Sequence, residues 1–146
     1  MSIAVEPSKA TYSGPSFDRA RVWDVMRVGV VTCRPETLLI DVARMMSLYQ
    51  IHSVVVQDVG EGERPWGIVS SLDIAAAAGS DFSVLTAQDV AQKQLVSVPA
   101  DASLRDAAKV MSEHAISHLV AVDRATDWPC GVISARGIAS ALAAPR

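Results

Sequence analysis

Ser70 and Asp73 stand three positions apart, where a strand-like segment meets an alanine-rich segment. The apolar run from Trp66 to Val69 ends at Ser70, and the composition from Leu72 onward favours a helix. A hydroxyl and a carboxylate delivered to the start of a helix can present hydrogen-bonding groups to a small ligand. The same two side chains could instead cap the helix, with the Asp73 charge favourably placed in its first turn.

A second copy of this pattern, Cys130 to Ile138, follows 64 positions later. Ser134 keeps the hydroxyl, but Gly137 stands in the place of Asp73. Because glycine has no side chain to hold a ligand, the sequence predicts one good site per chain. We also expect the substitution Gly137→Asp to create a second site.

The repeat extends over most of the chain. Leu39, Val42, Ala43 and Met46 have helical spacing, and a matching apolar face recurs 65 positions later. Each copy predicts the order β-α-β-β-α, which gives an α+β fold. A unit of this size buries only about 60% of its unfolded surface, so the copies should pack together with pseudo-two-fold symmetry around a shared cleft. The predicted boundaries are a flexible arm at 1–20, repeats at 21–79 and 86–143, and a linker at 80–85, with Trp23 as an anchor into the core.

Composition narrows the class of protein. The formal net charge is −3 and the pI is about 5.5, which offers no global field to attract nucleic acid. Cys33 and Cys130 lack metal-ligand spacing and are predicted to be reduced, a disulfide being the alternative. Neither a signal peptide nor a membrane span is expected, so the sequence predicts a soluble, cytoplasmic protein with no membrane partner. The common catalytic motifs are missing, which predicts that it is not an enzyme.

Several motifs, taken in order and found twice, resemble the tandem cystathionine β-synthase (CBS) domain pair, or Bateman module. The resemblance covers about Arg21 to Leu142 and implies a regulatory module that binds AMP, ADP or ATP, with S-adenosylmethionine or NAD less expected. It also implies a disc-like homodimer. The motifs are Asp41-Val42-Ala43-Arg44-Met45-Met46, Ile51 to Asp58, Gly67 to Ile74, Leu104 to Met111 and Ile116 to Asp123.

The resemblance also assigns residues to a nucleotide. It implies that Ser70 and Asp73 bind the ribose, where a vicinal diol offers two donors and a carboxylate offers only acceptors. The implied phosphate contacts are His52, Ser117, His118 and Arg136. The implied adenine contacts are Thr32 and Cys33 through backbone groups and Val55 and Ile68 through apolar side chains. The alternatives are structural histidines, a solvated arginine and ordinary core residues.

The sequence therefore predicts a non-enzymatic sensor that binds an adenosine-containing ligand between its repeats and changes its affinity for a regulated protein. No metal and no obligatory cofactor are expected. One alternative is a structural dimerisation module without a ligand. Another is a regulator that acts with a nucleic-acid-binding partner.

Overall fold

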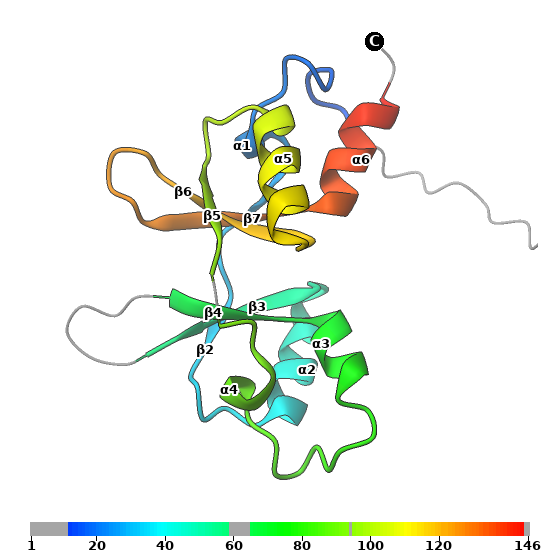
Figure 1. Ribbon diagram of the computed structural model, residues 1–146, viewed down its shortest axis with the longest axis vertical. Coiled ribbons are helices and arrows are strands. Elements are labelled where there is room, and N and C mark those ends of the chain that lie inside the picture. The colour runs from blue at the N-terminus through cyan, green and yellow to red at the C-terminus, as the bar shows by residue number, and fades with distance from the viewer. Residues whose placement is uncertain (1–11, 59–64, 94, 145–146) are drawn as a thin grey trace, which may run out of the picture. The chain divides into compact units, whose positions relative to one another are not determined.

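The computed structural model describes residues 12–58, 65–93 and 95–144, and the chain forms two compact units. Unit 2 is the continuous segment Gly29–Ser97, whereas unit 1 combines Met1–Val28 with Val98–Arg146. Each unit contains one sheet and several helices (Figure 1). The predicted α+β class and the two repeats of sheet and helices are confirmed.

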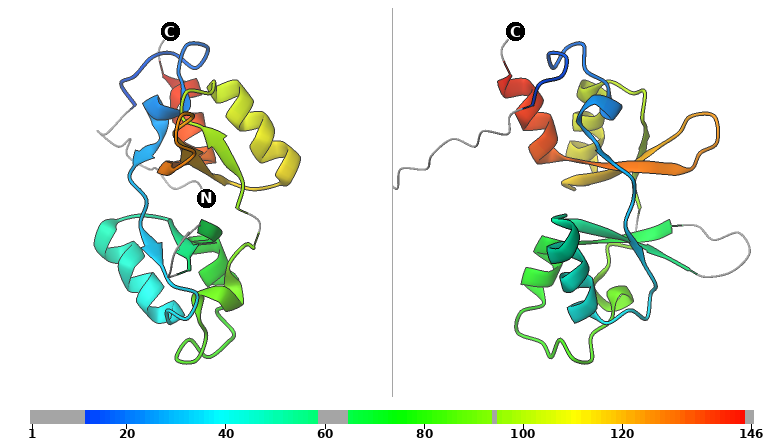
Figure 2. Two further views of the ribbon diagram at one scale, coloured as in Figure 1. Left: turned by 90° about the vertical axis from the view of Figure 1, so that its left-hand side faces the viewer. Right: turned by 180° about the vertical axis from the view of Figure 1, so that it is seen from behind.

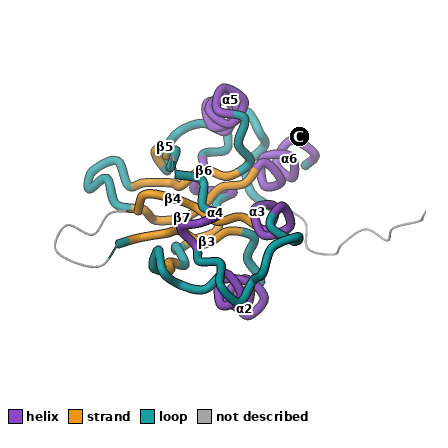
Figure 3. Tube along the Cα trace, turned by 60° about the horizontal axis from the view of Figure 1, so that its bottom comes forward, coloured by secondary structure: helices purple, strands orange, loops and turns teal. Residues whose placement is uncertain are grey.

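Unit 2 is built on a three-stranded sheet of order β2-β3-β4. β2 runs parallel to β3, and β3 runs antiparallel to β4. A loop joins α3 to α4 in this unit (teal in Figure 3). The elements are β2 (Thr32–Cys33), α2 (Leu39–Tyr49), β3 (Ser53–Gln57), β4 (Pro65–Ser70), α3 (Ser71–Ala76) and α4 (Ala87–Val90).

The core of unit 2 forms between α2 and one face of the sheet. Leu39, Val42 and Met46 make the buried stripe of α2 that their spacing predicts. They belong to one hydrophobic cluster with Val54 and Val69, whose strand positions place both side chains on the same face of the sheet. This packing leaves the other face of the sheet for the alternate strand residues.

Unit 1 repeats the arrangement with one strand more, in the order β1-β7-β6-β5. α5 and α6 lie on one face of this sheet (Figure 2). The order β-α-β-β-α holds in both units, as predicted. The elements are α1 (Val22–Val25), β1 (Arg27–Val28), β5 (Ser97–Pro99), α5 (Leu104–His114), β6 (His118–Val122), β7 (Pro129–Ser134) and α6 (Ala135–Ala143).

The compact units differ from the sequence repeats because the opening segments are exchanged. α1 and β1 begin the first repeat, yet they belong to unit 1, where β1 pairs antiparallel with β7. α4 begins the second repeat, yet it belongs to unit 2. Gln92, which follows α4, exchanges two backbone hydrogen bonds with Ile68 of β4, at 2.9 and 3.2 Å. Each unit therefore receives an edge segment from the other repeat.

One local expectation changes in unit 1, and the described end of the predicted arm makes contacts there. Trp23 is 53% exposed, so it is not the core anchor; its neighbour Val22 is fully buried. The described end of the segment predicted as a flexible arm contacts α5, where Asp18 forms an ion pair with Arg105 at 2.9 Å. The Arg105 guanidinium also lies 5.3 Å from the centre of the Phe17 ring. These contacts attach the segment to its own unit.

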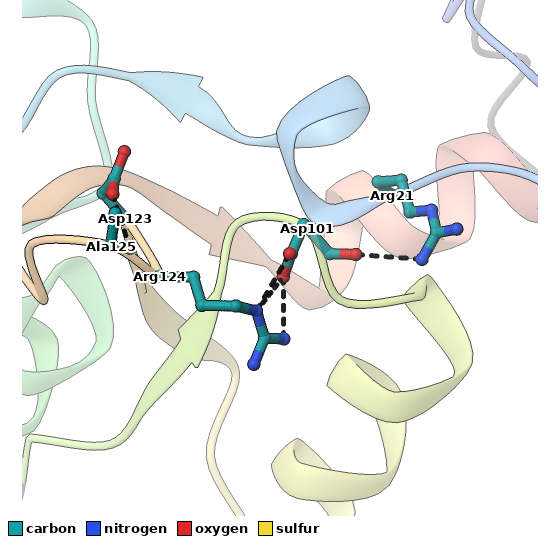
Figure 4. A network of polar contacts seen from close by, with 5 residues as sticks. All are labelled: Arg21, Asp101, Asp123, Arg124 and Ala125. Atoms are coloured by element: carbon teal, nitrogen blue, oxygen red, sulfur yellow. Dashed lines mark hydrogen bonds and ion pairs between the residues drawn. The ribbon is translucent and has the colours of Figure 1, made fainter.

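A polar network joins three connecting segments of unit 1 (Figure 4). Arg124 donates to both carboxylate oxygens of Asp101, from Nε at 3.0 and 2.9 Å and from Nη2 to Oδ1 at 2.8 Å. Arg21 donates to the Asp101 carbonyl oxygen at 3.0 Å. The Arg124 hydrogen bonds lower the pKa of Asp101, so the ion pair is formed at neutral pH. Within the described ranges, no helix has the length and apolar character needed to cross a membrane.

Two equivalent glycines allow the edge segments to lie close to the sheets. A Cβ at Gly131 would lie 2.5 Å from the Arg27 carbonyl oxygen and 2.7 Å from Met26 Sδ. A Cβ at Gly67 would lie 3.0 Å from the Gln92 carbonyl oxygen. The contacts with the Arg27 and Gln92 carbonyl oxygens involve the backbone of the exchanged segments, which cannot turn aside as a flexible side chain can.

We predict that Gly131→Ala lowers the free energy of unfolding by about 1–3 kcal/mol, because the added methyl group overpacks the β1 contact. Gly79→Ala is the control, since a Cβ there meets no heavy atom within 4 Å. Urea unfolding of both variants measures the difference. Equal free energies of unfolding for the two variants would contradict the close-approach explanation.

Candidate functional site

Three residues predicted to contact adenine form one row across the sheet of unit 2. Thr32 of β2 pairs with Val55 of β3, and Val55 pairs with Ile68 of β4. Directly paired residues direct their side chains to the same face of a sheet. This row is on the face opposite to Val54 and the α2 core. Val55 and Ile68 are buried, whereas Thr32 is exposed, so the row combines two buried apolar side chains with one exposed hydroxyl.

Cys33 differs from this row because its side chain belongs to the α2 core. It pairs with Val56, and both are members of the buried cluster. Burial, assisted by the nearby charge of Glu36, raises the pKa of the Cys33 thiol to about 11. The thiol is therefore protonated at neutral pH and is a poor nucleophile. Any ligand contact at this position would have to use the backbone, as the resemblance implied. Cys33 and Cys130 are both free thiols.

The polar end of the same face is formed by Ser70, the last residue of β4. Ser70 pairs with Ser53, two positions along β3 from Val55, so both serines share the face of the adenine row. Ser70 is also the N-cap of α3, because its Oγ accepts a hydrogen bond from the Asp73 backbone N–H at 3.2 Å. The strand-to-helix junction predicted here is confirmed.

Asp73 completes a capping box with Ser70. Its Oδ2 accepts from the Ser70 backbone N–H at 2.8 Å and from Ser70 Oγ at 2.9 Å. The capping interpretation is therefore confirmed. The other carboxylate oxygen, Oδ1, accepts from Gln92 Nε2 at 3.0 Å. The half-buried carboxylate is thus held by three donors and keeps acceptor capacity on Oδ1.

Sequence reasoning missed Gln92. The sequence places this glutamine after the opening segment of the second repeat, 19 positions beyond Asp73. The structure brings it to unit 2 through the backbone pairing with Ile68. The repeat itself contained a signal, because Gln92 and Arg27 are equivalent at the repeat offset of 65. In the structure they pair with the equivalent residues Ile68 and Val132.

His52 is the one predicted phosphate contact that belongs to unit 2. It directly precedes β3, its side chain is exposed, and its carbonyl oxygen accepts from the Ser71 N–H at 2.9 Å. This hydrogen bond places the backbone of His52 against the first residue of α3. His52 is therefore at the same strand-to-helix junction as Ser70.

The other three predicted phosphate contacts belong to unit 1. Ser117 occupies the position equivalent to His52, and its carbonyl oxygen accepts from the Ala135 N–H at 2.8 Å. Its hydroxyl lies 3.0 Å from Nδ1 of His118, the first residue of β6. Arg136 is exposed in the first turn of α6. Ser117 and His118 thus contact each other, and Ala135 connects their junction to Arg136.

Unit 1 keeps the helix cap but not the carboxylate. Ser134 Oγ accepts from the Gly137 N–H at 3.1 Å, as Ser70 does from Asp73. A Cβ at Gly137 would lie 2.8 Å from Cγ1 of Val25 in α1. The place of an acidic side chain is therefore already crowded by a β-branched residue.

Among the residues that the structure describes, no group of three or more His, Cys, Asp or Glu side chains could hold a metal ion. Several acidic residues instead cap helices, stabilise turns or pair with basic side chains. Asp89, for example, accepts from the Thr86 backbone N–H and hydroxyl at 2.8 and 2.9 Å. This pair repeats the Ser70–Asp73 capping box at the start of α4.

Comparison with known proteins identifies both repeats. The family model described as "CBS domain" matches residues 22–80 and again residues 87–144. A homoserine O-acetyltransferase of Methanosphaerula palustris is 28% identical over 142 residues, which are 97% of this chain and 28% of that protein. An inosine-5'-monophosphate dehydrogenase of Bifidobacterium longum is 29% identical over 64% of this chain and 17% of that enzyme. The chain thus spans only a minor part of both enzymes.

Solved structures of the same fold include proteins with adenosine-containing ligands bound. A CBS domain protein of Pyrobaculum aerophilum complexed with AMP has a TM-score of 0.70 at 23% identity, and the match covers 81% of this chain and 89% of that one. A CBS domain pair in complex with 5'-methylthioadenosine and S-adenosyl-L-methionine has a TM-score of 0.70 at 21% identity, over 82% of this chain and 93% of that one. The duplicated family match, together with this fold, shows that the chain belongs to the CBS domain family and carries two CBS domains in tandem.

Proposed function

We propose that the chain is a non-enzymatic regulatory module that binds an adenosine-containing ligand, AMP, ADP or ATP, at unit 2. The observation that carries this proposal is the shared face of the sheet, where the row Thr32, Val55 and Ile68 leads to Ser70 and Asp73. The row supplies the apolar side chains of Val55 and Ile68, which are buried in the structure, next to the exposed Thr32. The junction offers a carboxylate acceptor for sugar hydroxyls.

The comparisons support the class of ligand. The Pyrobaculum aerophilum protein was solved with AMP, and the other pair with 5'-methylthioadenosine and S-adenosyl-L-methionine. The adenosine group is common to these molecules. The proposal follows this shared part, and it is supported by the acceptor capacity that Asp73 Oδ1 keeps for a sugar hydroxyl.

The regulatory part of the proposal rests on the relatives. The matched segment is 28% of the acetyltransferase and 17% of the dehydrogenase, so a similar segment occurs in two enzymes of different chemistry. A module that regulates an enzyme, and does not itself catalyse a reaction, could occur in both of these enzymes. Ligand binding would change its affinity for a regulated protein if two conformations bind the ligand unequally. The homodimer and the cytoplasmic location stay predictions.

We predict that isothermal titration of the full chain detects binding of AMP, ADP or ATP, and that Asp73→Ala weakens it about 10- to 100-fold, since hydrogen bonds to a charged acceptor are lost. S-adenosylmethionine and NAD are titrated alongside. Binding of none of the five by folded protein would favour a structural dimerisation module.

Asp89→Ala is the matched control for this experiment. It removes the same type of capping box from unit 2, at α4, without touching the Ser70 junction. Both variants should lower Tm, but only Asp73→Ala should lower the affinity. Equal affinity of the wild type and Asp73→Ala would remove the site assignment and leave Asp73 with its capping role alone.

The expectation that Gly137→Asp creates a second site is revised by the crowding at Val25. We predict that this substitution lowers Tm and leaves the stoichiometry at one ligand per chain, because the new side chain meets Val25 at its first atom. Val25→Ala combined with Gly137→Asp should recover part of the lost stability. Two ligands per chain together with the Tm of the wild type, for Gly137→Asp alone, would contradict the revision.

A further inference from the structure

We infer that Gln92 is a specificity-determining residue of the ribose site, where its amide binds one hydroxyl of the diol while Asp73 binds the other. The inference rests on the proposed function and extends it. It begins with the direct contact in unit 2, where Gln92 Nε2 lies 3.0 Å from Asp73 Oδ1.

The hydrogen-bonding capacity of Asp73 is the first step. Each carboxylate oxygen has about two lone-pair sites. Both sites of Oδ2 are used by the backbone N–H and the hydroxyl of Ser70, and one site of Oδ1 is used by Gln92. A vicinal diol brings two donors. Asp73 can therefore accept one hydroxyl while its capping box stays intact, and the other hydroxyl needs another acceptor.

The amide of Gln92 provides that acceptor. A carboxylate only accepts, so the amide must direct its nitrogen to Asp73, which places the attached Oε1 beside the same carboxylate. Gln92 is exposed, so a ligand can approach its side chain. The pair Asp73 Oδ1 and Gln92 Oε1 then offers two neighbouring acceptors to two neighbouring hydroxyls.

The backbone of Gln92 is held in place independently of its side chain. Its N–H donates to the Ile68 carbonyl oxygen at 2.9 Å, and its carbonyl oxygen accepts from the Ile68 N–H at 3.2 Å. Ile68 belongs to the row assigned to the base. The same residue pairing therefore connects the expected position of the base to the expected position of the sugar.

Unit 1 differs at both members of this pair. Arg27 occupies the position of Gln92, opposite Val132, and Gly137 occupies the position of Asp73. An arginine beside a carboxylate forms a bidentate ion pair that occupies both oxygens, whereas a neutral glutamine engages only one. The combination that leaves acceptors for a diol is thus present in unit 2 alone.

The test uses the full chain and the nucleotide that binds most tightly in the titrations above, together with its 2'-deoxy and 3'-deoxy forms. We expect the wild type to bind both deoxy forms more weakly than the parent. Gln92→Met should weaken parent binding about 3- to 10-fold, the effect of one neutral hydrogen bond. It should also abolish discrimination against one deoxy form and keep discrimination against the other, which depends on Asp73. A purely structural role of Gln92 would not separate discrimination against one deoxy form from discrimination against the other.

Gln88→Met is the matched control, since Gln88 is an exposed glutamine of α4 and the substitution makes the same change of side chain. It should leave all three affinities unchanged. Gln92→Leu is a second variant that also removes the amide, and it is expected to give the same result as Gln92→Met. It keeps the test decisive if Gln92→Met fails to fold.

Unchanged discrimination in Gln92→Met, or tighter binding of the parent nucleotide, would overturn the role of Gln92 while the proposed function stands. Tighter binding would mean that the amide competes with the ligand for Asp73. Absence of nucleotide binding by the folded wild type would overturn the proposed function and this inference together.

Discussion

The pairing of an exchanged segment with the last strand of each unit is the constraint on which the architecture depends. In unit 1 this segment is β1, paired with β7; in unit 2 it is Gln92, paired with Ile68. The backbone approaches closely enough that glycine is required at Gly131 and favoured at Gly67. Because each segment comes from the other sequence repeat, neither repeat contains all the residues of a compact unit.

This constraint also forms the candidate site. Ser70 and Asp73 come from one repeat, and Gln92 comes from the beginning of the next. The carboxylate is held by donors from both sources, with one oxygen committed to the helix cap and the other to an exposed amide. Capping and ligand binding are therefore compatible functions of the same side chain, because they use different oxygens.

Local patterns predicted much of the fold, and long-range pairing explains what they missed. The stripe Leu39, Val42 and Met46 and the Ser70 junction depend on neighbours within one or two turns, so periodicity and capping preferences suffice to find them. Trp23 and Gln92 depend on which unit receives the exchanged segment, which no local pattern specifies. The sequence predicts Trp23 as the core anchor, whereas the structure buries its neighbour Val22 and leaves Trp23 exposed.

Unit 2 is a single continuous segment, whereas unit 1 combines the segment before unit 2 with the segment after it. During synthesis, all residues of unit 2 are added to the chain before those of α5 and α6. The residues of α1 and β1 are made before unit 2, yet their partner β7 is made after it. The folding of unit 1 must therefore close a loop that spans the whole of unit 2, and an order of folding in which unit 2 precedes unit 1 follows from the connectivity alone.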